Sequence, residues 1–191
     1  MRKSIPCVAA VLMTLLGRSS VQASWRIDAE GGAFVPVSKV SINTPDGNVD
    51  AGVNAGGSFA AGAGYGIGDW FEPTAHFQGN FAGLAVPFGE ELQVYSLTGG
   101  GRVYLTEPQM VRPWLTSEIG WYHANFNETG LFSSSNSTAN SFGLNAGAGV
   151  DVAVSPTVSL GVDARYNNAF NAFKGIQFVT TMLNVGIHLG Q

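Results

Sequence analysis

Apolar and polar residues alternate with a period of two along most of the chain after residue 23. In the segment 25–37, for example, the odd-numbered residues are apolar or small, whereas the even-numbered ones include Arg26, Asp28 and Glu30. This is the period of a β-strand with one apolar face and one polar face. The pattern predicts eight strands, at residues 25–37, 57–68, 71–81, 92–105, 112–125, 141–154, 158–166 and 176–189.

The predicted strands are joined alternately by short turns and long polar segments. Short turns fall near Asp69, Pro108 and Pro156, and the long segments are 38–54, 82–91, 126–140 and 167–175. Outer-membrane barrels combine short periplasmic turns with longer outer loops in this way. We therefore predict an all-β fold, an eight-stranded antiparallel up-and-down transmembrane β-barrel with both ends of the barrel domain on the periplasmic side.

Alternation by itself does not say whether the apolar face points outward into lipid or inward to a soluble core. A soluble, lipocalin-like barrel that binds a small ligand in an apolar interior is the alternative fold. Charged residues make up only 12% of the chain, against about 25% in soluble domains, and this scarcity favours lipid outside. Tryptophans are expected at the membrane interfaces, and the candidates are Trp25, Trp70, Trp114 and Trp121.

In a lipid-facing barrel the polar face lines the lumen. Ten titratable residues are then predicted to form an ion-pair network there: Arg26, Asp28, Glu30, Glu72, His76, Arg102, Glu118, Asp151, Asp163 and Arg165. Charges in a narrow interior must pair, because an unpaired buried charge costs several kcal/mol. The alternative is that these side chains are wetted and only loosely paired.

The sequence carries no recognisable metal or cofactor motif. Its histidines, His76, His123 and His188, are far apart, and the only cysteine is Cys7. Without a short-spaced pair of ligands we expect no metal and no cofactor.

Residues 1–23 have the pattern of a secretory signal peptide. Arg2 and Lys3 precede a short apolar run, and Ala23 ends a small-residue cleavage pattern. Cleavage there leaves residues 24–191 as the barrel domain. The basic count falls from nine to six while the acidic count stays 13, so the mature charge is 6 − 13 = −7. An acidic chain without a basic cluster argues against nucleic acid as a partner.

Three segments resemble the small outer-membrane β-barrel family that includes OmpX, Ail and the membrane domain of OmpA. They are residues 62–72 (GAGYGIGDWFE), 99–105 (GGGRVYL) and 112–115 (RPWL). The resemblance implies a monomer in the bacterial outer membrane, with membrane lipid, lipopolysaccharide and the barrel-assembly machinery as partners. Members of this family usually end on an aromatic residue, whereas this sequence ends on Leu189, Gly190 and Gln191.

The predicted outer loops are where a specific function is expected. Four apolar side chains in them are candidate contacts for a host or phage ligand: Leu131, Phe132, Phe170 and Phe173. The alternative is that the loops are only solvated connections. We expect no catalysis; a barrel enzyme acting on outer-membrane lipid is the remaining alternative, but His123 is followed by Ala124 and Asn125, without the serine of the lipid A deacylase motif.

Overall fold

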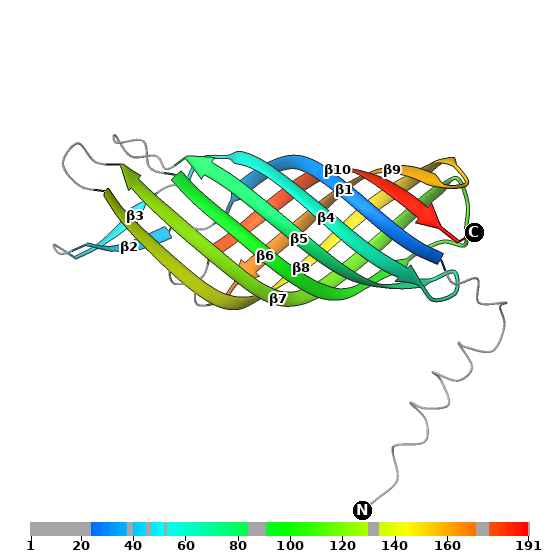
Figure 1. The fold of residues 1–191 in the computed structure, drawn as a ribbon, viewed down its shortest axis with the longest axis horizontal. Coiled ribbons are helices and arrows are strands. Elements are labelled where there is room, and N and C mark those ends of the chain that lie inside the picture. Colours follow the sequence, from blue (N-terminus) through cyan, green and yellow to red (C-terminus); the bar gives the residue numbers. More distant parts are fainter. Residues whose placement is uncertain are drawn as a thin grey trace, which may run out of the picture.

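The computed structural model describes residues 24–37, 40–44, 47–51, 53–83, 91–129, 134–170 and 176–190 (Figure 1). All of its regular structure is β. The ten strands are β1 (Ser24–Pro36), β2 (Val40–Thr44), β3 (Gly47–Ala51), β4 (Gly56–Gly66), β5 (Phe71–Gly83), β6 (Glu91–Tyr104), β7 (Val111–Thr129), β8 (Ser134–Ser155), β9 (Val158–Ala169) and β10 (Ile176–Leu189). No helix among these residues is long and apolar enough to cross a membrane.

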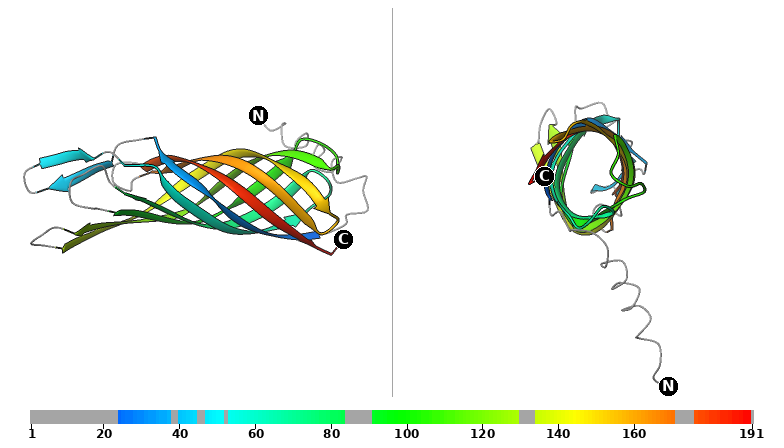
Figure 2. Two further views of the ribbon diagram at one scale, coloured as in Figure 1. Left: turned by 90° about the horizontal axis from the view of Figure 1, so that it is seen from above. Right: turned by 90° about the vertical axis from the view of Figure 1, so that its right-hand side faces the viewer.

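Eight of the strands form a closed antiparallel barrel in the order β1-β10-β9-β8-β7-β6-β5-β4. Seven of the eight strand pairings join barrel strands that are consecutive along the chain. The eighth closes the ring, where β1 pairs with β10 from Trp25 with Leu189 to Pro36 with Phe178. The ring is evident when the molecule is viewed along its axis (Figure 2). The predicted eight-stranded up-and-down barrel is therefore confirmed.

The apolar face of the barrel points outward and the polar face points inward. Leu97, Ile119 and Leu183 in the strands are 59%, 62% and 71% exposed. Interior positions carry Arg, Asp, Glu, Asn and Thr instead, and a soluble barrel would have the opposite arrangement. Polar backbone groups are fully paired in a closed barrel, so this surface is suited to lipid. The lipocalin-like alternative is excluded.

The two ends of the barrel differ, as the connection lengths predicted. The short turns lie at the end that also holds the start of β1 and the end of β10 (Figure 1). At the opposite end, which we call the loop end, β2 and β3 form a separate hairpin. Within that hairpin the register runs from Val40 with Ala51 to Thr44 with Gly47.

The segment 126–140 was predicted to be a loop, and this prediction is wrong for most of its length. β7 runs to Thr129 and β8 begins at Ser134, and the two pair throughout. Strand pairing is made by backbone hydrogen bonds and does not need alternating apolar side chains. A Ser- and Asn-rich sequence therefore does not show where pairing stops. A long β7–β8 hairpin therefore extends beyond the rest of the barrel at the loop end (Figure 2).

The interior is not polar throughout. Its loop half is filled by an apolar cluster of Phe34, Ala82, Leu92, Val94, Tyr122, Ala124, Ala169, Ile176 and Phe178. The rings of Phe34 and Phe178 lie 4.8 Å apart. Strand parity predicts that these side chains point inward. Phe34, for example, lies on the same face of β1 as Arg26 and Asp28. The apolar cluster occupies the lumen between the loops and the charged residues below.

Candidate functional site

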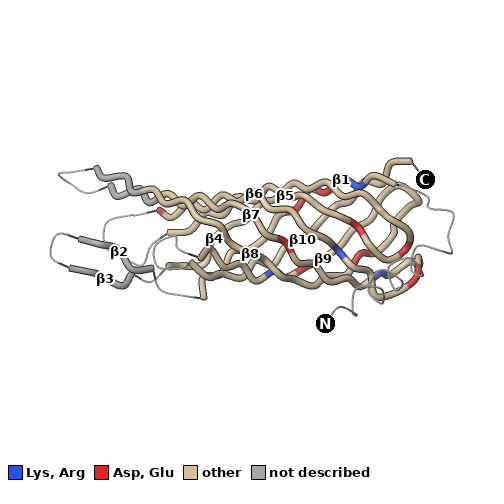
Figure 3. The backbone as a smooth tube through the Cα atoms, turned by 90° about the horizontal axis from the view of Figure 1, so that it is seen from below, with Lys and Arg blue, Asp and Glu red and all other residues tan. Residues whose placement is uncertain are grey.

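All ten titratable residues predicted to face the lumen are buried inside the barrel. Charged positions gather in the half nearest the short turns (Figure 3). Strand alternation explains their common direction, since every one belongs to the inward-facing set of its strand. The register then decides which of them meet, and it divides them into two neighbouring groups.

The first group surrounds Arg26 close to the turn end. Arg26 Nε contacts Asp28 Oδ1 at 2.5 Å, and Nη1 pairs with Asp151. Nη1 also donates to the hydroxyl of Tyr104 at 2.9 Å. Asp28 is two residues from Arg26 on β1, whereas Asp151 comes from β8 and Tyr104 from β6. One guanidinium thus links three strands across the lumen.

Arg102 is the second cation of this group and is held more loosely. Its nearest carboxylate oxygens are on Glu72 at 3.4 Å and on Asp28 at 3.7 Å. Its guanidinium also lies 4.2 Å from the ring centroid of Trp114, a cation–π distance. Arg102 is 1% exposed, so its guanidinium is shielded from bulk water.

The second group surrounds Arg165, deeper in the barrel. Arg165 Nη2 donates to Glu30 at 2.6 Å, and Nε lies 3.0 Å from Asp163. Asn184 Nδ2 approaches the other oxygen of Asp163 at 3.4 Å. This cation therefore bridges β1 and β9 through a short hydrogen bond to Glu30 and a close ion pair with Asp163.

Glu118 is the acceptor for four side chains in the same group. His76 Nδ1 lies 2.6 Å from its carboxylate, and the hydroxyls of Thr74 and Thr98 donate at 2.8 and 2.6 Å. Asn145 Nδ2 donates at 3.0 Å. The carboxylate is thus satisfied by hydrogen-bond donors without an arginine. Thr74, Thr98 and Asn145 were not among the predicted site residues, although their parity places them on the lumen face.

Glycine makes room for the long interior side chains. Gly62 pairs with His76, and a Cβ on Gly62 would lie 2.2 Å from Cδ2 of that imidazole. Any other residue would displace the ring, so the glycine is required by close approach and not by backbone conformation.

Trp114 was predicted to lie at the membrane interface, and the structure corrects this. It is 1% exposed and packs under Arg102 inside the lumen. Residue 114 has the same parity as Thr116 and Glu118, so its strand position, rather than its nearness to the turn, determines its direction. Trp25, Trp70 and Trp121 do lie on the outer surface, 57%, 49% and 43% exposed.

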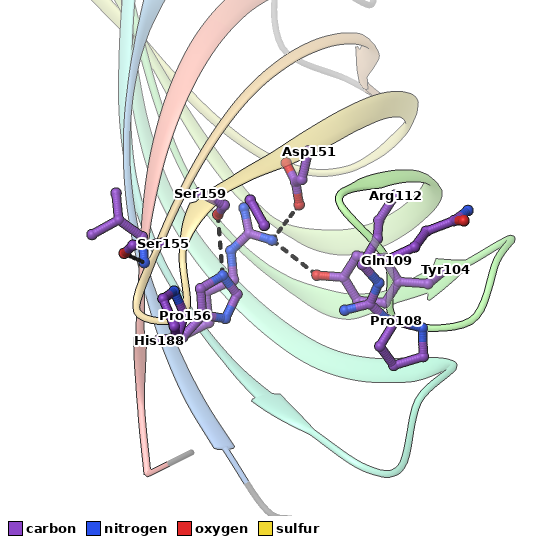
Figure 4. A pocket seen from close by; sticks show the side chains of 12 residues that line it. Tyr104, Pro108, Gln109, Arg112, Asp151, Ser155, Pro156, Ser159 and His188 are labelled. Atoms are coloured by element: carbon purple, nitrogen blue, oxygen red, sulfur yellow. Dashed lines mark hydrogen bonds and ion pairs between the residues drawn. The ribbon is translucent and has the colours of Figure 1, made fainter.

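A cavity of about 160 Å³ opens at the turn end (Figure 4). Arg26, Tyr104 and Asp151 form its inner wall, and Pro108, Gln109, Arg112 and His188 lie around its mouth. Arg112 stacks on the Tyr104 ring at 3.8 Å, and His188 Nε2 lies 3.1 Å from the hydroxyl of Ser159. The cavity connects the turn end with the first charged group.

Of the four predicted loop contacts, only Phe170 lies in the part of the chain that the structure describes. It is 41% exposed, and its backbone N–H donates to the carbonyl of Phe142 at 2.9 Å. Leu131, Phe132 and Phe173 lie outside the described residues.

The interior charges do not balance. Among the described residues the lumen holds six carboxylates, on Asp28, Glu30, Glu72, Glu118, Asp151 and Asp163, and three guanidiniums, on Arg26, Arg102 and Arg165. Ion pairing with arginine therefore accounts for half of the negative charge. The arrangement links strands firmly, but it leaves an acidic interior.

Comparison with known proteins agrees with this architecture. Neisserial surface protein A is 21% identical, with 91% of this chain and 100% of that chain covered and a TM-score of 0.60. Ail, the attachment invasion locus protein of Yersinia pestis, is 18% identical over 87% and 98% of the chains, with a TM-score of 0.55. The N-terminal β-barrel domain of Pseudomonas aeruginosa OprF is 17% identical over 87% and 97%, with a TM-score of 0.53.

At these identities the solved structures show a common fold. No curated protein matches the sequence significantly. The outer membrane protein beta-barrel domain, by contrast, matches residues 8–188, nearly the whole chain. The chain therefore belongs to the outer membrane protein beta-barrel domain family and is a small integral β-barrel protein of the bacterial outer membrane.

Proposed function

We propose that this protein is a surface-contact protein whose β7–β8 hairpin binds a host or phage ligand outside the cell. The observation that carries the proposal is the length of this hairpin. The outermost lipid-facing apolar pair on it is Trp121 with Phe142. Eight further residue pairs follow, from Tyr122 with Ser141 to Thr129 with Ser134. At about 3.3 Å per residue the hairpin continues for roughly 26 Å along the strand direction.

One edge of this hairpin is open among the described residues. β8 pairs with β9 only from Gly143 onward, so its residues 134–141 have no strand partner on that side in the part of the chain described. β7, in contrast, is paired with β6 as far as Asn127 with Glu91. An open edge offers backbone N–H and C=O groups to an extended segment of another protein.

The charge of the outer segments indicates what kind of partner fits. Only two cations, Lys39 and Lys174, belong to the predicted outer loops, against Asp46, Asp50, Glu90, Glu91 and Glu128. One solved relative, Ail of Yersinia pestis, was crystallised with the heparin analogue sucrose octasulfate. A net negative loop end disfavours such an anionic ligand. It favours a neutral or basic partner that hydrogen-bonds to backbone, Ser and Asn groups.

Deleting residues 128–137 tests the proposal. Cells that display this variant should lose the adhesion to host cells, or the sensitivity to phage, that the parent barrel confers. A matched deletion of 40–51 removes the β2–β3 hairpin and should leave the same phenotype in place. Heat-modifiable migration on a gel verifies that both variants fold. Adhesion and phage sensitivity that are unchanged in the 128–137 deletion contradict the proposal.

We also infer that the barrel acts without catalysis. Support comes from the one histidine close to the outer surface: His123 Nδ1 contacts Asn140 Oδ1 at 2.8 Å and its ring stacks on Trp121. Its partners are therefore an amide and an indole, which do not activate a nucleophile. Overexpression followed by mass spectrometry of lipid A tests this inference, and an altered lipid mass contradicts it.

Two further proposals concern assembly. The 1–23 segment lies outside the described residues, and we propose that it is removed after Ala23; the mass of the protein from isolated outer membranes should correspond to a chain beginning at Ser24. We propose a monomer embedded among membrane lipid and lipopolysaccharide and inserted by the barrel-assembly machinery. Depletion of that machinery should abolish the heat-modifiable form.

A further inference from the structure

Three ligand-type side chains meet inside the lumen at the junction of the two charged groups. Asp28, Glu30 and His76 each offer one ligand atom, and these atoms lie within 4.8 Å of one another. Asp28 and Glu30 are two residues apart on β1, so they share the inward face, whereas His76 comes from β5. β4 separates the two strands in the barrel, and only the curvature of the closed ring brings the three side chains together.

Each of the three residues uses one polar atom on a protein neighbour and leaves the other without a hydrogen bond. Arg102 Nη2 lies 3.7 Å from Asp28 Oδ2. Asp28 Oδ1 contacts Arg26, and Glu30 Oε1 accepts from Arg165. Asp28 Oδ2, Glu30 Oε2 and His76 Nε2 are buried without a hydrogen-bond partner. Buried polar atoms are rarely left in this state, because each costs about 1–3 kcal/mol. Three such atoms meet at this point and are available to a ligand.

The orientation of His76 is that of a metal ligand. Its Nδ1 lies 2.6 Å from Glu118, which accepts hydrogen bonds and therefore holds the ring proton on Nδ1. Nε2 then presents its lone pair, 3.7 Å from Glu30 Oε1. Metal-bound histidines almost always donate their second ring N–H to an acceptor, which is a carboxylate, a backbone carbonyl or water. The ring is 2% exposed and lies directly against Gly62 of β4.

The charge of the lumen favours a cation. Six carboxylates and three guanidiniums leave a net charge of 3 − 6 = −3 when His76 is neutral. A divalent ion reduces this excess to −1 without protonating a carboxylate. Arg26, Arg102 and Arg165 oppose a cation nearby. Arg26 and Arg165 are each already paired with two carboxylates, and Arg102 Nη1 lies 3.4 Å from Glu72. The cavity at the turn end extends to Arg26, which in turn contacts Asp28.

We propose that Asp28, Glu30 and His76 bind a divalent transition-metal ion, with Zn²⁺ as the best match. One imidazole nitrogen and two carboxylate oxygens are ligands that Zn²⁺ accepts, and water completes a tetrahedral site. The mixed nitrogen and oxygen set disfavours Ca²⁺ and Mg²⁺, which prefer oxygen ligands alone. The ion ties β1 to β5 across the lumen and neutralises part of its charge.

The test uses the full barrel folded in detergent micelles, freed of metal with a chelator and then equilibrated with Zn²⁺. After removal of unbound ion, mass spectrometry of the metal content should find about one zinc per wild-type barrel. His76→Gln should abolish this binding. The control His123→Gln removes a histidine that stacks on Trp121 at the outer face of β7, away from the site, and this variant should bind zinc as the wild type does.

Unfolding in urea provides a second readout that does not depend on recovery of bound metal. Zn²⁺ should raise the urea midpoint of the wild type and of His123→Gln, because an ion that binds the folded state stabilises it. It should not raise the midpoint of His76→Gln or Glu30→Gln. If His76→Gln does not fold, Glu30→Gln takes its place in both measurements. A wild-type barrel that binds no zinc above the buffer level, or variants that bind it equally, overturns the proposal.

Discussion

Replacing Arg165 by methionine tests whether the buried charges stabilise the barrel by pairing. Arg165 is 1% exposed and has direct contacts of 2.6 Å with Glu30 and 3.0 Å with Asp163. The substitution keeps most of the side-chain volume but leaves two carboxylates without their cation. Breaking a buried ion pair from one side costs about 3–5 kcal/mol. With an m-value of about 2 kcal/mol per M, the urea midpoint should fall by roughly 2 M.

The assay is equilibrium unfolding in urea, followed by the heat-modifiable band, with a chelator present so that bound metal does not contribute. Arg102→Met should cost less, about 1–3 kcal/mol, because its carboxylate distances of 3.4 and 3.7 Å are too long for hydrogen bonds. Arg112→Met is the matched control. That arginine is half-buried at a turn and donates to the carbonyl of Asp69, so its loss should cost about 1 kcal/mol at most.

A double variant separates charge from packing. Glu30→Gln in the Arg165→Met background removes one uncompensated carboxylate and should restore about 1–3 kcal/mol. If Arg165→Met unfolds at the wild-type midpoint, the side chains are wetted and loosely paired, and the network adds nothing to stability. If the double variant is less stable than Arg165→Met alone, the loss came from packing and our electrostatic reasoning is refuted.

Three further predictions use the same unfolding assay, the first of them in lipid bilayers. Leu97→Arg places a charge in the middle of β6 on the outer face, where Leu97 is 59% exposed, and should cost about 2–4 kcal/mol in a bilayer; a neutral result would contradict lipid contact at this position. Trp114→Ala should cost about 3–5 kcal/mol because the indole is buried, whereas Trp70→Ala, on the outer surface, should cost clearly less; equal losses would argue against a luminal Trp114. Gly62→Ala should cost about 1–3 kcal/mol, since its Cβ would meet the His76 ring, and Gly57→Ala, which has open space, is the control; equal effects would remove the steric argument.

The lumen is filled by two layers of side chains, one apolar and one charged, that follow one another along the barrel axis. Toward the loops, Phe34 and Phe178 pack with aliphatic side chains, and toward the turns the arginines and carboxylates fill the same cross-section. Both layers join strands that are distant in sequence. These contacts stabilise the closed barrel against separation of β1 from β10. An eight-stranded barrel has just enough interior for such side chains.

The alternation along the chain by itself determined the fold class, the number of barrel strands and the inward set of charged residues. This works because the side-chain period of a strand is two, so that one apolar face and one polar face are visible in sequence. The same rule places Trp114 inside, because the direction of a side chain follows from its parity in the strand and not from its nearness to a turn. Strand parity likewise places the apolar cluster around Phe34 and Phe178 in the lumen.

Only the tertiary structure decided which inward residues meet. Glu30 and Arg165 are 135 residues apart, and His76 and Glu118 are 42 apart; nothing in the local pattern selects these partners among six carboxylates. The strand register and the closure of β1 on β10 set them, because both fix the height of each side chain along the barrel axis and its position around it. The end of the β7–β8 hairpin was also beyond the sequence pattern, since backbone pairing outside the membrane needs no periodic side chains. The grouping of Asp28, Glu30 and His76 has the same origin: three residues without a motif become neighbours because the sheet is bent into a narrow ring.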